Sequence, residues 1–361
     1  MIQIRFSRIY IDWPLFYGLI ILIAVGLLVI YSASNQNMDM IIRQLIRIAV
    51  ALIALMFFAQ LEPDTLYRWS PYIYAVGLTL LILVLLFGIT GKGAQRWLNI
   101  GFIRLQPSEI MKLAVPMMTA WIMVRFSFPA NFKSITLALI VITIPCAMVI
   151  AQPDLGTAIL IAASGLVVLF LAAVSWKLIF LSCGLIAAIA PFIWANLHSY
   201  QQNRIVTLFD PWSDPLGAGY HTIQSVIAIG SGGMYGKGWL NGTQARLDFI
   251  PEQSTDFIFS VFAEEFGLVG VLLLLGLYMF IVLRCLKISL TVQHTYSRLL
   301  AGSLATTFFC YLFVNIGMVS GILPIVGVPL PLISYGGTSM VTLMAAFGVL
   351  MSISTHKKLM H

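Results

Sequence analysis

Charged residues are scarce in this chain of 361 residues. Only 9% of them are Asp, Glu, Lys or Arg, whereas 60% are hydrophobic and the mean hydropathy is +0.98. Soluble globular domains carry roughly 25% charged residues, so the composition excludes a soluble globular protein. The net charge of +7 does not indicate a nucleic-acid-binding protein, because basic residues of membrane proteins gather in loops beside lipid.

Cysteines and common catalytic motifs are scarce as well. All four cysteines lie within or at the end of apolar blocks, which argues against a disulfide framework: they are Cys146, Cys183, Cys285 and Cys310. The sequence has no GxSxG, HExxH or CxxC pattern, and its five histidines are scattered. These absences give no support to a nucleophile-elbow hydrolase or a zinc enzyme.

Continuous apolar blocks dominate what is there. A transmembrane helix needs ~20 apolar residues, whereas barrel strands alternate, so we expect an all-α integral membrane protein with about ten helices. They form a single domain over residues 1–361. The expected spans are residues 14–31, 44–60, 72–89, 109–125, 135–151, 157–174, 178–196, 257–284, 299–321 and 335–353.

The basic residues set the expected orientation. An even number of spans puts both termini on one side, and residues 299–355, which contain no charge, fit an outward and a return crossing. With both termini in the cytoplasm, 11 of the 20 basic residues lie in short inner loops, as the positive-inside rule requires. Arg5 and Arg8 precede an apolar run without a small-residue cleavage site, so we expect a retained first span.

Two hydrophilic segments, residues 90–108 and 197–255, then face away from the cytoplasm. The second connects the seventh and eighth helices, and loops of this length are usually functional or disordered. It contains aromatic residues and an apolar run at 223–229. We therefore expect it to fold onto the membrane surface as short amphipathic pieces.

Glu109 and Lys112 are charged residues in the fourth expected span. They lie three residues apart on one helical face, and charge at membrane depth costs roughly 2.5 kcal/mol or more. Lys112 lies about 20 Å from Arg125 along the helix, which is below the outer boundary of a core of ~30 Å. Two interpretations stay open: an ion pair that holds two helices together, or a polar cavity open to the outside.

Asp256 stands at the expected outer start of the eighth span. An acidic residue in a first helical turn is stabilised by the helix dipole and needs no other purpose. It also ends the longest outer loop at the membrane surface, where a carboxylate could meet a lipid headgroup. Glu264 and Glu265 follow about 12 Å deeper, and one of them must face the bundle interior because lipid accepts neither.

Asp154 lies in a short turn between the fifth and sixth spans, together with Pro153 and Gly156. Its carboxylate could simply cap the sixth helix. It also faces the same side of the membrane as Asp256 and Glu109, which keeps a functional role open.

Residues 321–337 are apolar but contain three prolines and four glycines. Non-helical backbone at membrane depth is tolerated only where protein covers it or a cavity lies beside it. We therefore expect a re-entrant or partly unwound element on the outer side, adjoining the charged groups.

A second glycine-rich run surrounds Lys237. It could present backbone N–H groups to a phosphate, although such a run is also typical of a flexible turn.

Five segments resemble the SEDS proteins of bacterial cell-wall assembly, and the resemblance extends over essentially the whole chain. They are KGAQRWLNIGFIRLQPSEIMK (92–112), AQPDLGT (151–157), DPLGAGYHTIQSVIAIGSGGMYGKGWLNGTQ (214–244), LDFIPEQSTDFIFSVFAEEFGLVG (247–270) and GILPIVGVPLPLISYGG (321–337). The stretch KGWLNGTQ and the short first segment are most similar to the member that acts in elongation. The resemblance implies a peptidoglycan glycosyltransferase that polymerises lipid II on the outer face of the cytoplasmic membrane.

The resemblance also implies roles for single residues. The catalytic aspartate of the family corresponds to Asp256, its polar pair in the fourth span to Glu109 and Lys112, and another polar position of its central cavity to Asp154. A class B penicillin-binding protein and other membrane proteins of the elongation complex are the implied partners. Magnesium or manganese is the implied cofactor, for which the sequence shows no ligand set.

The implied reaction makes its own demands. A β-1,4 bond formed from an α-linked diphosphate donor inverts the anomeric carbon, so a general base must act on the acceptor hydroxyl, and we assign this role to Asp256. The leaving diphosphate requires positive charge. The candidates are Lys112, Arg96, Arg104, Lys237 and Arg246, of which the last four could equally serve attraction to anionic lipid.

Ser334 and Gly336 are expected to line a groove for the prenyl tail of the substrate. Two other functions stay open at this point. A flippase that moves lipid II between leaflets would also use buried charges, and a non-catalytic scaffold would only recruit the crosslinking enzyme. The long outer loop and the carboxylate at the membrane surface favour chemistry at that surface.

Overall fold

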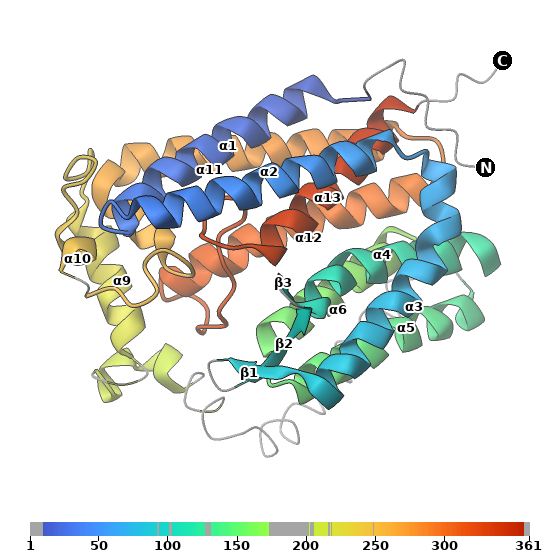
Figure 1. Cartoon of the computed structure of the whole chain (residues 1–361), viewed down its shortest axis with the longest axis horizontal. Helices are drawn as coiled ribbons and strands as arrows, with labels where there is room; N and C mark the ends of the chain where they lie inside the picture. The colour runs from blue at the N-terminus through green and yellow to red at the C-terminus, as the bar shows by residue number, and fades with distance from the viewer. Residues whose placement is uncertain are drawn as a thin grey trace.

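The computed structural model describes residues 10–91, 94–100, 103–126, 131–172, 202, 206–215, 217, 219–247 and 249–356. Within these ranges the chain forms a bundle of long helices (Figure 1). They are α1 (Trp13–Ala33), α2 (Met38–Gln60), α3 (Pro63–Phe87), α4 (Pro107–Phe126), α5 (Phe132–Ala151), α6 (Leu155–Leu171), α11 (Ile258–Thr291), α12 (Thr295–Val319) and α13 (Thr338–Thr355). Each coincides with one of the expected spans. The remaining span, residues 178–196, lies outside the described residues, as does Cys183.

The fold class is confirmed. Among the described residues, seven helices are long and apolar enough to cross a membrane: α1, α2, α3, α5, α11, α12 and α13. The two others at expected positions are α6, an apolar helix of 17 residues, and α4, which carries Glu109, Lys112 and Arg125. The chain is therefore a multi-pass α-helical membrane protein.

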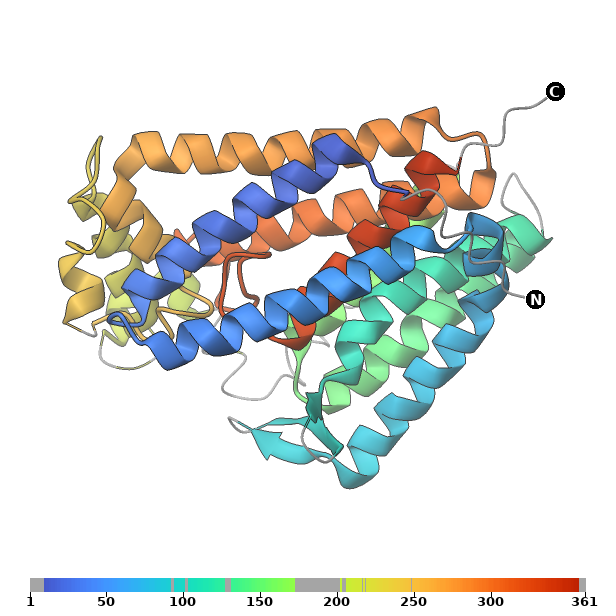
Figure 2. The same cartoon turned by 45° about the horizontal axis from the view of Figure 1, so that its top comes forward.

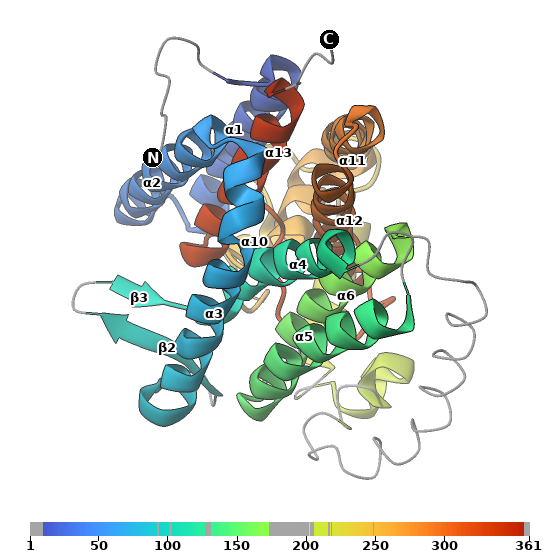
Figure 3. The same cartoon turned by 90° about the vertical axis from the view of Figure 1, so that its right-hand side faces the viewer.

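The packing places α4 at the centre of the bundle. It contacts α3, α5, α6, α12 and α13, and most of its residues are buried, including both charged residues of its first half. Helix α13 packs along α2, and α12 packs along both α11 and α6. Figure 3 shows α3 to α6 gathered on one side of this arrangement and α11 beside α12 on the other.

The start of α1 and the end of α13 are joined by a cluster around Asp12. Arg284 of α11 donates to both carboxylate oxygens of Asp12, at 3.0 and 2.8 Å, and the Ser354 hydroxyl donates at 2.7 Å. Burial alone would raise the pKa of Asp12, but these hydrogen bonds and that of the Leu15 N–H lower it below its ordinary value. The start of α1 and the end of α13 therefore lie at one end of the bundle (Figure 1), as an even number of spans requires.

A small antiparallel sheet that was not expected precedes α4. Its strands are β1 (Ile89–Gly91), β2 (Ala94–Ile100) and β3 (Ile103–Leu105), in the order β1-β2-β3. Ile100 pairs with Ile103 in the register of β2 and β3. The sheet lies within the hydrophilic segment 90–108 and at its edges, so an otherwise helical bundle carries a short β element on one surface.

The long loop before α11 contains short helices, as expected. They are η1 (Pro211–Ser213), α9 (Tyr220–Ser231) and α10 (Thr243–Arg246), and α9 and α10 lie at the end of the bundle opposite the chain ends (Figure 1). Helix α11 is broken beside them. Gly267 has φ 65° and ψ −167°, and Figure 2 shows α11 changing direction near this end. Helix α11 therefore consists of an outer piece, residues 258–266, and a longer remainder.

Candidate functional site

Asp256 lies two residues before α11, in a turn. The eighth span was expected to begin at residue 257 with Asp256 at its helical start, but α11 begins at Ile258 and has no acidic residue in its first turn. Asp256 therefore lies just outside the first turn of this helix. The side chain is half-buried, and its Oδ2 lies 3.5 Å from the position that a Cβ on Gly327 would occupy.

The main chain around Asp256 is held by two other elements. The Asn315 amide nitrogen of α12 donates to the carbonyl oxygen of Asp256 at 2.8 Å. The Ser334 hydroxyl donates to the carbonyl oxygen of Thr255 at 2.6 Å, and the Tyr335 N–H donates to that of Ser254 at 2.9 Å. Three consecutive carbonyl groups are therefore fixed, and the position of Asp256 is fixed with them.

Residues 320–337, which we call the unwound segment, connect α12 to α13. All of them are described and none is helical, so the expectation of a partly unwound element is confirmed. Protein covers this backbone: the Tyr278 hydroxyl of α11 donates to the Pro331 carbonyl at 2.6 Å, and Gly26 of α1 allows close approach of Ile333. Ser334 is 5% exposed, and its hydroxyl donates to the Thr255 carbonyl oxygen.

Glu109 and Lys112 form a direct ion pair, with Lys112 Nζ 2.7 Å from Glu109 Oε1. Their exposures are 5% and 8%. The Thr342 hydroxyl of α13 donates to the second carboxylate oxygen at 3.3 Å, and the ammonium group lies 4.8 Å from the ring centre of Tyr311 on α12. The first interpretation of this pair, in which it joins helices, is therefore supported by its contacts with α12 and α13. A cavity beside it stays a prediction.

Asp154 and Arg96 also lie together. Asp154 caps α6 by accepting from the Thr157 N–H at 3.2 Å, as the simpler interpretation predicted. It also pairs with Arg96 of β2, whose Nε lies 3.5 Å from Oδ2, while another guanidinium nitrogen donates to the Pro153 carbonyl at 2.6 Å. The β-sheet thus brings a cation to the start of α6. The side chain of Arg104 lies outside the described residues.

Tyr311 connects the pair of Glu109 and Lys112 with the turn of Asp256. Its ring centre lies 4.8 Å from the Lys112 ammonium group, and it packs with Leu160 of α6 and Val328 of the unwound segment. The carbonyl oxygen of Val328 in turn accepts a hydrogen bond from the Asn315 amide nitrogen at 2.7 Å. Two sequence-predicted acidic positions, Asp256 and Glu109, are therefore joined by one continuous set of contacts through α12, whereas Asp154 is paired with Arg96.

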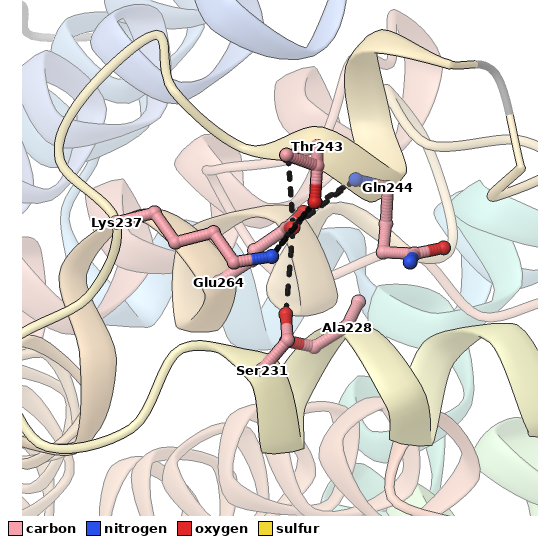
Figure 4. Close-up of polar contacts among 6 residues, drawn as sticks. All are labelled: Ala228, Ser231, Lys237, Thr243, Gln244 and Glu264. Atoms are coloured by element: carbon pink, nitrogen blue, oxygen red, sulfur yellow. Dashed lines mark hydrogen bonds and ion pairs between the residues drawn. The ribbon is translucent and has the colours of Figure 1, made fainter.

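Lys237 belongs to a different cluster, around Glu264 (Figure 4). The carboxylate of Glu264 is fully buried and accepts from Lys237 Nζ at 2.7 Å, from the Thr243 N–H at 2.9 Å and from the Gln244 N–H at 3.1 Å. In the glycine-rich run around Lys237, the N–H groups of residues 236–238 all donate to protein carbonyl oxygens, so these three are not offered to a phosphate. Arg246 ends α10 nearby.

Both glutamates of α11 are buried, whereas the sequence required that one of them face the interior. Glu265 is 1% exposed and accepts a short hydrogen bond from the Ser32 hydroxyl of α1.

The residues that sequence reasoning missed are the uncharged Asn315 and Tyr311. A single asparagine within 57 uncharged residues, at 299–355, was the available signal, because an amide in lipid must find partners.

Comparison with known proteins agrees with this architecture. The family model of the FtsW, RodA and SpoVE cell cycle proteins matches residues 8–359. The peptidoglycan glycosyltransferase MrdB of Escherichia coli K12 is 52% identical over 355 residues, which cover 98% of this chain and 96% of that protein. The probable peptidoglycan glycosyltransferase FtsW of Trichlorobacter lovleyi is 35% identical, with coverage of 96% and 94%.

Two solved structures share the fold. One describes the coordination of polymerization and crosslinking by a peptidoglycan synthase complex; its TM-score is 0.84 at 31% identity, with 96% of this chain and 99% of that chain covered. The other is the rod shape determining protein RodA of Thermus thermophilus, with a TM-score of 0.73 at 26% identity and coverage of 96% and 98%. The chain belongs to the FtsW/RodA/SpoVE family of cell cycle proteins, which is the SEDS family.

Proposed function

We propose that this chain is a peptidoglycan glycosyltransferase of the bacterial inner membrane that polymerises lipid II during cell elongation. Two relatives that it matches over nearly their whole length bear the name of this activity, one of them at 52% identity. The observation that carries the residue assignment is the fixed turn of Asp256. The main chain that carries this half-buried carboxylate is held next to a membrane helix by α12 and the unwound segment.

Asp256 acts as the general base in this proposal. The hydroxyl of the acceptor sugar gives its proton to the carboxylate while its oxygen forms a bond to the anomeric carbon of the donor. The bond from that carbon to the diphosphate breaks, and the electron pair leaves with the lipid diphosphate. A rigid turn serves this step because the base must lie within hydrogen-bond distance of the proton that it removes.

Arg96 and Lys112 differ in how they can stabilise the leaving diphosphate. The Arg96 side chain is 34% exposed beside Asp154, so we assign it direct contact with phosphate oxygens. Lys112 is buried against Glu109, and we assign it a contribution through its electrostatic field. Lys237 is paired with Glu264, so in this proposal it supports the outer loop. The Ser334 hydroxyl likewise has a structural role, because it donates to the Thr255 carbonyl oxygen. Gly336 lies two residues after Ser334 in the unwound segment.

We assign the end of the bundle that carries α9, α10 and Asp256 to the outer face of the membrane, with both termini in the cytoplasm. The count of basic residues in the inner loops supports this orientation. Similarity to a structure of a peptidoglycan synthase complex that couples polymerization to crosslinking supports a class B penicillin-binding protein as the partner, within the elongation machinery.

The divalent cation implied by the resemblance does not fit the described side chains. Within the described ranges, no three carboxylate, imidazole or thiol groups lie close enough to hold a metal ion. We therefore propose that any magnesium or manganese requirement is met through the diphosphate oxygens of the donor. Polymerisation assays with chelator, followed by addition of either metal, test this requirement.

Polymerisation of labelled lipid II by the purified chain in detergent, with a transpeptidase-inactive partner present, tests the function. Detergent has no second leaflet, so glycan formation excludes a pure flippase, and uncrosslinked glycan excludes a pure scaffold. We expect Asp256→Asn and Asp256→Ala to remain folded and to lose activity by at least a hundredfold. Asp214→Asn, which changes an exposed acidic residue of the same loop, should retain it. Normal turnover by Asp256→Ala would refute the assignment.

A further inference from the structure

The break in α11 at Gly267 separates four main-chain groups that would form hydrogen bonds with one another in an intact helix. In a continuous helix, the N–H groups of residues 268 and 269 would donate to the carbonyl oxygens of residues 264 and 265. All four instead bond to residues 233–238, which we call the inserted loop. The bonds are Leu268 N–H to Gly233 O (2.9 Å), Val269 N–H to Met234 O (3.1 Å), Lys237 N–H to Glu264 O (3.0 Å) and Gly238 N–H to Glu265 O (3.0 Å).

The inserted loop reaches the helix because glycine allows it to. A Cβ on Gly236, whose φ is +77°, would collide with the carbonyl group of Glu265. A Cβ on Gly232, just before the loop, would collide with the carbonyl group of Ala263. Gly267 itself faces the backbone of Met234 to Gly236 with φ +65°. The glycine-rich run is therefore explained by close contact between two backbones.

Side chains fasten the loop to the outer piece of α11. Lys237 Nζ pairs with the buried carboxylate of Glu264 at 2.7 Å, and the same carboxylate accepts from the Thr243 N–H at the start of α10 (Figure 4). Trp239 continues the contact to α1 by donating to the Leu28 carbonyl at 3.2 Å. The outer piece is thus bonded to the loop at its last turn, where the carbonyl groups of Glu264 and Glu265 accept from loop N–H groups and the Glu264 carboxylate accepts from Lys237.

We propose that the inserted loop is a positioning device for Asp256: it stabilises the broken form of α11 and so sets the direction of the outer piece, which begins two residues after Asp256. The same four backbone groups would be satisfied within a continuous helix, which would point the outer piece elsewhere. The loop therefore selects between two arrangements. The inference rests on the proposed function, because it concerns the residue that we assign as the base.

Glycine variants test this proposal because they add no group that could contact substrate. Gly236→Ala and Gly232→Ala place a methyl group against α11. Gly230→Ala on α9 and Gly276→Ala on α11 are matched controls, since a Cβ at either position meets no atom within 4 Å. The full chain with its partner is measured in detergent by hydrogen–deuterium exchange of the peptide that covers residues 264–270, and by kcat and KM for lipid II, per folded molecule.

We expect the amide exchange of residues 268 and 269 to rise at least tenfold in Gly236→Ala and Gly232→Ala. Their kcat should fall at least tenfold while KM stays within twofold, because the substrate contacts are intact and only the base is displaced. Both controls should behave as wild type. Gly232→Ala keeps ordinary helical φ at residue 232, so it remains informative if Gly236→Ala does not fold.

Two results would overturn the proposal: faster exchange at residues 268 and 269 with unchanged kcat, or wild-type exchange in both loop variants. Failure of the proposed function gives a different pattern. Wild-type protein that shows protected amides at these residues but makes no glycan would refute the enzymatic assignment, and with it a catalytic purpose of the loop, while supporting the stabilised break itself.

Discussion

Asn315 donates from one amide nitrogen to the carbonyl oxygens of both Asp256 and Val328, at 2.8 and 2.7 Å. The asparagine is fully buried in α12. One side chain therefore ties the turn that carries Asp256 to the unwound segment, and the two elements cannot shift independently while both bonds exist.

Asn315→Leu keeps the size of this side chain and removes both donors. Each buried carbonyl group that loses its hydrogen-bond donor lowers the free energy of unfolding by about 1–3 kcal/mol. Displacement of the catalytic base lowers the rate. We expect kcat to fall by roughly tenfold to a hundredfold and the melting temperature to fall as well, measured by lipid II polymerisation and thermal unfolding in detergent. Thr306→Val on the same helix removes a hydroxyl that bonds only to Gly302, and it should leave kcat unchanged. Full activity of Asn315→Leu would contradict the role given to this residue.

Ser334→Ala removes one hydrogen bond to the Thr255 carbonyl and one from the Leu330 N–H. Since Thr255 precedes Asp256, we expect a fall in kcat of about fivefold, which is the effect of roughly 1 kcal/mol. Ser320→Ala is the control, because the Ser320 hydroxyl donates to the Ile316 and Gly317 carbonyl groups at the end of α12. Equal rates for the two variants would show that the Ser334 bond does not hold the active turn.

A double-mutant cycle on Glu109 and Lys112 measures what their contact contributes. Removing one member leaves a buried charge without its partner, which costs about 3–5 kcal/mol, whereas an apolar replacement of both is often neutral. We therefore expect Glu109→Leu and Lys112→Met each to lower the melting temperature more than the double variant does. Additive losses would show that the two charges act separately, as they would in a wet cavity.

Asp12 makes the stability of the bundle depend on pH in the acid range. Its pKa in the folded protein lies below its ordinary value of 3.8, so the stabilisation by Arg284 and Ser354 is complete above that value and is lost as the pH falls through the lower one. Between pH 6 and 3, the melting temperature of wild type should therefore fall more steeply than that of Asp12→Asn. Parallel curves would show that Asp12 does not contribute.

Hydropathy predicted the helices because a membrane demands continuous apolar runs, and each described long helix lies at an expected position. The break in α11 could not be predicted in this way. Gly267 stands within an apolar run that is typical of an uninterrupted helix, and only the loop 30 residues earlier in the sequence makes a broken helix stable. Periodicity carries no information about such distant backbone partners.

The site was predicted unevenly for a related reason. Asp256, Glu109 and Asp154 attract attention because charge in lipid is costly, and the pairing of Glu109 with Lys112 follows from their spacing. The partner of Asp154 is Arg96, on a β-sheet that was not expected. The sequence offered a weak signal for that sheet: Gly101 and Phe102 stand between Ile100 and Ile103, a spacing typical of a two-residue hairpin.

The contact between Asp12 and Ser354 joins residues that are 342 positions apart in the chain. At a synthesis rate of roughly 5–20 residues per second, tens of seconds separate the synthesis of α1 from that of α13. The Asp12 carboxylate remains at the membrane surface, without this hydroxyl, throughout insertion of the helices between them. The contact of Asp12 with Ser354 can therefore form only after α13 has been made.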